Sequence, residues 1–254
     1  MARKAVVSTI HVKHLIEMAP PECWPPEFHY GVKTYDVGMP VLGMYLLTTA
    51  PPIFEHPDGP GSAVSAGYAG WPDDMLRFLW NVRNGRWMTE FAWLLVATPT
   101  LADPSRTPPG HHTVKILSPQ AYEPPTGVSP ERARDEFADR MLAFASSIAP
   151  NLRDEFILAR MVKGPHDYEQ QNLHMIHGAF HGGDRGIAQS GANRPVPGWA
   201  QHRMPIKGLY QTGGTTHPGG SITGVPGRNA ARILLGDLGY DVDQVLAPMT
   251  ARQS

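Results

Sequence analysis

The chain has 254 residues, of which 41% are apolar and 18% charged, and its net charge is -1. The apolar fraction is large enough for a hydrophobic core, and the balanced charge excludes the basic excess typical of nucleic-acid binders. With 26 Gly and 26 Pro residues, the chain stays below the about 25–30% Gly plus Pro of disordered proteins, so we expect a loop-rich globular protein.

Cysteine usage and apolar runs bear on the cellular compartment. Cys23 is the only cysteine in the sequence, so the chain cannot form an internal disulfide. The apolar run before His11 is too short for a signal peptide, and every other run falls far below the about 20 residues of a membrane span. We therefore expect a cytoplasmic protein with no transmembrane segment and no nucleic-acid partner.

The first half of the chain favours strands separated by proline-rich loops. β-branched and apolar runs predict the strands, and the four prolines of residues 20–28 are expected to end any helix there. The expected elements are a strand at 4–9, a short helix at 11–18, a strand at 35–49 broken at Gly38 and Pro40, strands at 63–69, 91–98 and 113–118, and a helix at 73–84.

The second half begins with the clearest helix of the sequence, at residues 130–147. Ser129 suits its N-cap, Pro130 suits the first helical position, and apolar residues line one face. The remaining expectations are a loop and then a strand within 149–162, mostly loop over 166–205, a strand at 208–212, a helix ending at Leu238, and a loose tail after Gly239.

Residues 208–238 combine a strand, a glycine-rich loop and a helix. Six glycines fall between Gly213 and Gly227, and glycine lets backbone approach a bulky ligand. The helix that follows directs free N–H groups and a positive dipole end at the loop, which suits a phosphate or the pyrimidine edge of a reduced flavin. The spacing fits neither GxGxxG nor a P-loop. On chemistry alone, the segment is either a ligand site or a structural turn.

The segment GLYQTGGTTHPGGSITGVPGRNAA, residues 208–231, resembles the C-terminal signature of phytoene-desaturase-like FAD-dependent oxidoreductases. RPVPGWAQHRMPIKGLY at 194–210, APNLR at 149–153 and AVVS at 5–8 resemble other segments of that family. The resemblance covers most of the chain and is strongest at 194–238. It implies an α/β (α+β) fold, FAD as cofactor, and hydride transfer from a largely apolar organic substrate to the flavin.

The family's N-terminal GxGxxG unit, which grips the FAD pyrophosphate, has no counterpart in this sequence. Because the chain starts at Met1, near where the family's substrate domain begins, we expect half of a split enzyme whose dinucleotide-binding half is a second chain. A degenerate relative is the alternative: a non-catalytic scaffold or regulatory subunit that keeps the fold without flavin, or a module that binds a small molecule in an apolar tunnel alone. The resemblance implies a mixed-sheet substrate domain at 11–203, a partial FAD-binding domain from 1–10 and 204–240, and a tail at 241–254.

The resemblance also implies which residues contact the cofactor, although a tight turn would explain the same residues without one. Those expected near the ribityl and pyrophosphate are Gly213, Gly214 and Thr215, those beside the isoalloxazine ring are His217, Pro218, Gly219 and Gly220, and those leading to the helix end are Ser221, Ile222, Thr223 and Gly224.

Histidines and aromatic residues supply the other candidates. His174, His177 and His181 have helical spacing, but the neighbouring glycines argue against a helix, and we expect no metal site. His177-Gly178 resembles an HG pair near the family's active centre, which makes His177 a catalytic candidate for positioning substrate or moving a proton; an ordinary loop histidine is the alternative. We expect most of the following residues to be core, and some to line an apolar tunnel: Trp71, Phe78, Trp80, Trp87, Phe91 and Trp93.

Overall fold

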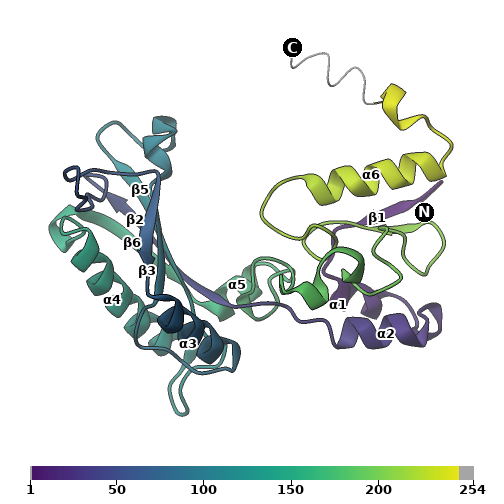
Figure 1. Ribbon diagram of the computed structural model, residues 1–254, viewed down its shortest axis with the longest axis horizontal. Helices are drawn as coiled ribbons and strands as arrows, with labels where there is room; N and C mark the ends of the chain where they lie inside the picture. The colour runs from purple at the N-terminus through teal and green to yellow at the C-terminus, as the bar shows by residue number, and fades with distance from the viewer. Residues whose placement is uncertain (1, 246–254) are drawn as a thin grey trace. The chain divides into compact units, whose positions relative to one another are not determined.

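The computed structural model describes residues 2–245, which form two compact units (Figure 1). The loop unit consists of Met1–Gly38 and Leu173–Ser254, and the sheet unit consists of Met39–Asn172. Both boundaries fall inside the range 11–203 that was expected to form one substrate domain. Whether the functional domains follow those expected limits stays a prediction, and residues 246–254 of the expected tail lie outside the described residues.

The sheet unit is built on five strands in the order β3-β4-β5-β2-β6, each antiparallel to its neighbours. The central position of β2 explains its nearly continuous burial. Gly43 in β2 is required by a close approach, because a Cβ atom there would lie 2.2 Å from the Tyr168 hydroxyl. The strands are β2 (Val41–Thr48), β3 (Ser65–Ala69), β4 (Trp93–Ala97), β5 (His112–Pro119) and β6 (Ile157–Lys163).

Helix α4 (Pro130–Ile148) lies along one face of this sheet and contacts β2 and β6 (Figure 1). The Ser129 side chain caps it by accepting from the Arg132 N–H at 3.3 Å, as the sequence predicts. Phe137 and Met141 project from its apolar face into the main hydrophobic core, where the strands supply leucines, valines and Ile116. The unit also contains α3 (Pro72–Arg83) and α5 (Pro165–Gln171).

The loop unit holds a two-stranded parallel sheet of β1 (Val6–Ser8) and β7 (Leu209–Gln211). Helix α6 (Val225–Asp237) contacts β7. A separate core, including Phe28, Val32 and Val196, involves α1 (Val12–Leu15) and α2 (Pro26–Lys33). The 3-10 helices of the chain are Ile16–Met18, Pro21–Cys23, Pro99–Leu101, Pro104–Arg106, Asp154–Phe156, Ile176–Gly178, Ile187–Gln189 and Gly191–Asn193.

The mixed α/β fold expected from the sequence is confirmed, and most element bounds agree within a few residues. Two helices were missed. Pro26 and Pro165 occupy the first positions of α2 and α5, where the missing proline N–H costs no hydrogen bond, so these prolines begin helices where the sequence was interpreted as loop. The strand expected at 35–49 is shorter and starts only after Pro40.

Candidate functional site

The glycine-rich loop connects β7 to α6 and is tied to β1 by hydrogen bonds. The Thr212 N–H donates to the Ser8 carbonyl at 2.8 Å. The buried Gln211 amide donates from Nε2 to the Ile10 carbonyl at 2.6 Å and to Thr215 Oγ1 at 3.1 Å. The loop therefore has a shape fixed by the chain itself, which is a requirement for a preorganised ligand site.

Several glycines of this loop are required by packing within the chain. A Cβ on Gly220 would lie 2.7 Å from the His181 carbonyl oxygen, and one on Gly214 would lie 3.0 Å from His174 Nε2. The Gly220 N–H donates to the same His181 carbonyl at 3.3 Å. The segment around His181 thus forms the floor of the loop, a long-range contact for which the sequence carries no local signal.

The start of α6 is open to solvent, in contrast to the loop floor. Gly224 adopts a left-handed φ of 72°, and an ideal Cβ on Gly224 or Gly227 would have no atom within 4 Å. Ile222 is fully exposed at 105%, and the Thr223 hydroxyl accepts from the Val225 N–H at 3.3 Å. The positive end of the helix dipole therefore faces open space rather than the packed interior.

The expected cofactor residues divide by exposure, while their role in binding stays a prediction. Thr215 and Gly219 are buried, Gly213, Gly214 and Gly220 are half-buried, and His217, Pro218, Ser221, Ile222, Thr223 and Gly224 are exposed. His177, the catalytic candidate, is exposed and takes a left-handed φ of 54°. The histidines that contact the loop are instead His174 and His181, which lie on either side of His177 in the sequence.

Sequence reasoning missed a group of buried polar residues next to the loop: His11, Tyr35 and Arg194. Burial lowers the pKa of His11 to about 3, and the nearby His174 adds a smaller effect in the same direction. The His11 and His174 rings meet edge to face with centroids 5.2 Å apart. Burial also lowers the pKa of His174 and of His181. These imidazoles are therefore neutral near pH 7.

Because His11 is neutral when folded and titrates near its ordinary pKa of 6.5 when unfolded, the unfolded chain binds more protons between about pH 6.5 and 3. Stability is therefore expected to fall as the pH drops through this window, by about 2 kcal/mol at pH 5 from His11 alone. Urea unfolding at pH 7.5 and pH 5 measures the loss. His11→Asn should reduce it, since an amide oxygen can still accept from the Lys13 N–H.

His56→Asn is the matched control, because His56 is exposed. An equal pH dependence in the wild type and His11→Asn would contradict the assignment of the effect to His11.

Unsatisfied polar atoms provide a test of whether a polar cofactor fits this region. Of the six buried side-chain atoms without a hydrogen-bond partner within residues 2–245, four surround the loop: His11 Nε2, His181 Nδ1, Gln211 Oε1 and Thr212 Oγ1. Buried polar atoms are normally satisfied by protein, water or ligand. His11 Nε2, His181 Nδ1 and the Thr212 hydroxyl can donate, so together with the open helix end they are compatible with a polar, anionic group such as FAD, whereas Gln211 Oε1 can only accept.

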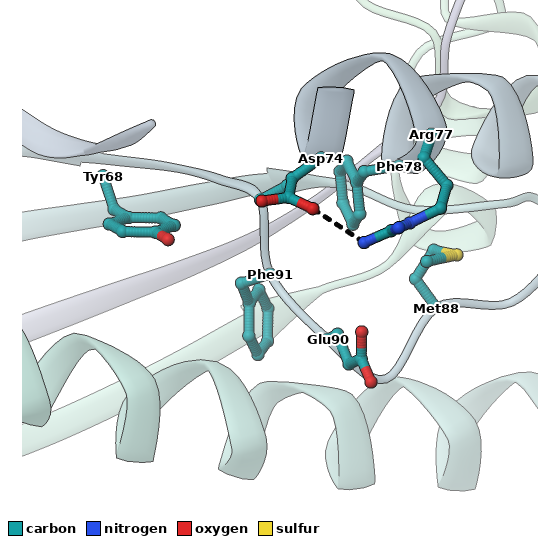
Figure 2. A pocket seen from close by; sticks show the side chains of 8 residues that line it. Tyr68, Asp74, Arg77, Phe78, Met88, Glu90 and Phe91 are labelled. Atoms are coloured by element: carbon teal, nitrogen blue, oxygen red, sulfur yellow. Dashed lines mark hydrogen bonds and ion pairs between the residues drawn. The ribbon is translucent and has the colours of Figure 1, made fainter. Parts of the chain in front are cut away.

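The sheet unit contains a separate pocket of about 230 Å³ (Figure 2). Figure 2 shows Phe78 and Phe91 beside an ion pair between Asp74 and Arg77, whose nitrogen and oxygen are 2.7 Å apart. Most of the six aromatic residues were expected in the core, and Phe78, Trp87 and Phe91 do pack in the cores, whereas Trp71 and Trp80 lie on the surface. Helix α3 turns Phe78 and Val82 inward, which leaves the Trp80 position on its outer side.

Membrane spans and metal clusters are both missing from residues 2–245. No helix in this range is both long and apolar enough to cross a bilayer. No group of three or more His, Cys, Asp or Glu side chains in the same range is placed to bind a metal ion.

Comparisons with known proteins find similarity to several oxidoreductases. The chain is 28% identical to the pyridine nucleotide-disulfide oxidoreductase domain-containing protein 2 of Mus musculus over 88% of its length and 40% of that protein. It is 29% identical to a subunit of the limonene dehydrogenase of Castellaniella defragrans, over 69% of the chain and 33% of that protein. It is 30% identical to a lycopene-forming phytoene desaturase of Paracoccus, over 57% of the chain and 28% of that protein.

A solved oxidoreductase from Methanosarcina mazei is 15% identical, with a TM-score of 0.46 over 92% of this chain and 42% of that one. No protein-family model matches the chain. The chain spans only 28–40% of the length of these curated relatives, which fits the expected C-terminal half. The chain is therefore a homologue of part of proteins that include a phytoene desaturase and a limonene dehydrogenase subunit.

Proposed function

We propose that this chain is one subunit of a split FAD-dependent oxidoreductase, which transfers a hydride from a largely apolar organic substrate to the flavin. A second chain supplies the dinucleotide-binding half, residues 1–10 and 204–240 complete the FAD-binding domain, and residues 11–203 form the substrate domain. Two relatives support this proposal by their names, since one is a dehydrogenase subunit and the other a desaturase. Each of the two names contains a hydrocarbon, limonene or phytoene, which supports an apolar substrate for this chain.

The observation that carries the proposal is the open start of α6 directly after a loop of fixed shape. Bound FAD would supply the two-electron oxidation chemistry. The loop backbone from Gly213 to Gly220 would hold the cofactor, and the positive dipole end of α6 near Gly224 would favour negative charge on it. His177, which is exposed, would position the substrate or move a proton.

The β1–β7 sheet supports the need for a partner chain. Val6 and Ser8 direct their backbone hydrogen bonds to β7, so the N–H and C=O of Val7 point to the opposite, open edge. Parallel sheets normally have both faces covered, yet Val7 is 46% exposed. A groove of about 470 Å³ in the same unit is lined mainly by apolar residues of β1, β7 and neighbouring segments, among them Val6, Val7, Ile10, Leu15, Met18 and Leu209.

Co-expression tests the proposal. This chain, produced together with a protein that carries the GxGxxG half, is expected to give a yellow complex with about one FAD per pair of chains. The chain purified alone should bind FAD poorly, because it lacks the pyrophosphate-binding unit. Absorbance spectra and size-exclusion chromatography measure both properties, with the partner purified alone as the control.

Tight FAD binding by the isolated chain would refute the split arrangement. A stable complex that contains no flavin would refute the cofactor and favour a scaffold role.

A further inference from the structure

Arg194 forms an unusual buried contact with the glycine-rich loop. The side chain is 1% exposed, and all of its hydrogen-bond acceptors are backbone carbonyls. Its Nη2 and Nε donate to the Gly214 carbonyl at 2.5 and 3.2 Å, and its Nη1 donates to the carbonyls of Asp184 and Gln189 at 2.6 and 3.3 Å. Nη2 also approaches the His181 carbonyl at 3.5 Å. One side chain therefore joins the loop to the segment beneath it.

Only an arginine can make this set of bonds. The planar guanidinium presents five donors in a fixed fork, whereas a lysine ammonium is a compact charge with three rotating donors. A Cβ on Gly219 would lie 3.4 Å from the guanidinium carbon, so the loop backbone lies directly against the fork. The shape of the loop thus depends on the position of Arg194.

The charge of Arg194 has no partner of opposite sign in direct contact. Within residues 2–245 it forms no ion pair, although the Asp184 carboxylate favours its charge from beyond ion-pair distance and Arg185 opposes it. Its closest aromatic contact is the Tyr35 ring, 5.7 Å from the guanidinium carbon. Burial lowers its pKa, but an arginine stays protonated in proteins. Its charge in turn contributes to the lowered pKa of His174 and of His181, so these neighbours stay neutral.

A buried charge without a counter-ion in direct contact is costly, because carbonyl dipoles and the more distant Asp184 carboxylate replace only part of its hydration. An anion bound on the loop would supply the missing charge at short range, where the low dielectric strengthens the attraction. The exposed residues His217 and Pro218 precede Gly219, so the outer side of the loop is accessible.

We propose that Arg194 is the positioning residue of the glycine-rich loop and that an anionic ligand bound at the loop is the counter-ion of its buried charge. This inference rests on the proposed function in one respect, because the ligand used to test it is FAD. The positioning role concerns the isolated chain and is tested without any cofactor.

The first experiment measures hydrogen exchange of the isolated chain for the wild type, Arg194→Lys and Arg194→Met. Amides of Gly219 and Gly220, which are bonded to Thr216 and His181, are expected to exchange at least tenfold faster in both variants. Exposed Arg106→Met is the matched control and should match the wild type. Unchanged exchange at these glycines in folded Arg194→Met would overturn the positioning role.

The second experiment uses the FAD-containing complex and separates charge from shape. Arg194→Met is expected to retain at least tenfold less FAD and to lower the reduction potential of what remains. Arg194→Lys, which keeps the charge, should restore the potential toward the wild type while the loop amides still exchange fast. Equal potentials for the wild type, lysine and methionine complexes would overturn the counter-ion role.

A measurement on the wild type keeps the inference testable if the variants do not fold. In nitrogen-15 spectra of the wild-type chain, the Arg194 side-chain N–H signals should be protected from exchange and should shift when FAD and the partner bind. Rapidly exchanging signals would overturn the positioning role, and signals that FAD leaves unmoved would overturn the counter-ion role. A wild-type complex without FAD would instead refute the proposed function, while the exchange data would still decide the positioning role.

Discussion

Gly224→Asp is expected to reduce FAD retention by the two-chain complex at least tenfold. Gly224 has a left-handed φ of 72° at the N-terminus of α6, a conformation that Asp and Asn tolerate better than other side chains. An aspartate there would place a negative charge at the helix end that we propose to face the electron-rich edge of the flavin. Repulsion between the two would replace the favourable interaction with the dipole. FAD content per complex after gel filtration measures the effect.

Gly224→Asn is the matched control, because it has the same size and backbone preference without the charge. A tenfold change in affinity needs about 1.4 kcal/mol, and asparagine adds no charge that could repel the flavin by that amount. This variant should therefore retain FAD within about twofold of the wild type. Both substitutions carry the same cost of a side chain at a left-handed φ, so they should lower the melting temperature of the isolated chain by a similar, small amount. Equal FAD content in the two variants would rule out a charge-sensitive ligand at the start of α6.

Phe137→Ala is expected to destabilise the sheet unit by about 3–5 kcal/mol. Phe137 is 1% exposed in the main core, where its ring lies 5.1 Å from the Phe91 ring and 6.0 Å from the Trp87 ring, measured between centroids. Removing the ring leaves a cavity that this close-packed cluster cannot fill without losing other contacts. Urea unfolding followed by circular dichroism and Trp fluorescence measures the loss.

Phe180→Ala serves as the control for Phe137→Ala. Phe180 is 39% exposed, so its removal should cost far less. A loss below about 1 kcal/mol for Phe137→Ala would show that α4 and the sheet pack together loosely around this ring.

The elements that the sequence predicts are those with local signals. Helix α4 has a capping serine, a proline at its first position and an apolar face, and all three act within the same 20 or so residues. The prolines of α2 and α5 show the limit of such signals. A proline is compatible with the first turn of a helix as well as with a break, and only the surrounding packing decides between them.

The candidate site is predictable only in part for a similar reason. The strand, glycine-rich loop and helix are contiguous, so residues 208–238 suggest a ligand site by themselves. Arg194 joins that site by bonds to backbone carbonyls, which any residue type supplies, and His11 joins it through its contact with His174, far away in the chain. Arginine is mostly exposed in proteins, so nothing in the neighbouring residues signals that this one is buried.

The pairing of β1 with β7 also constrains the order of folding. The residues that fix the loop are far apart in the chain, as the bond between Gln211 and Ile10 spans 201 positions. During synthesis from the N-terminus, the contiguous segment Met39–Asn172 is complete before β7 exists, so it can fold first. Strand β1 must stay unpaired through that period, and the entropy of closing so long a loop is offset only when β7 arrives. The glycine-rich loop is therefore among the last parts of the nascent chain to take shape.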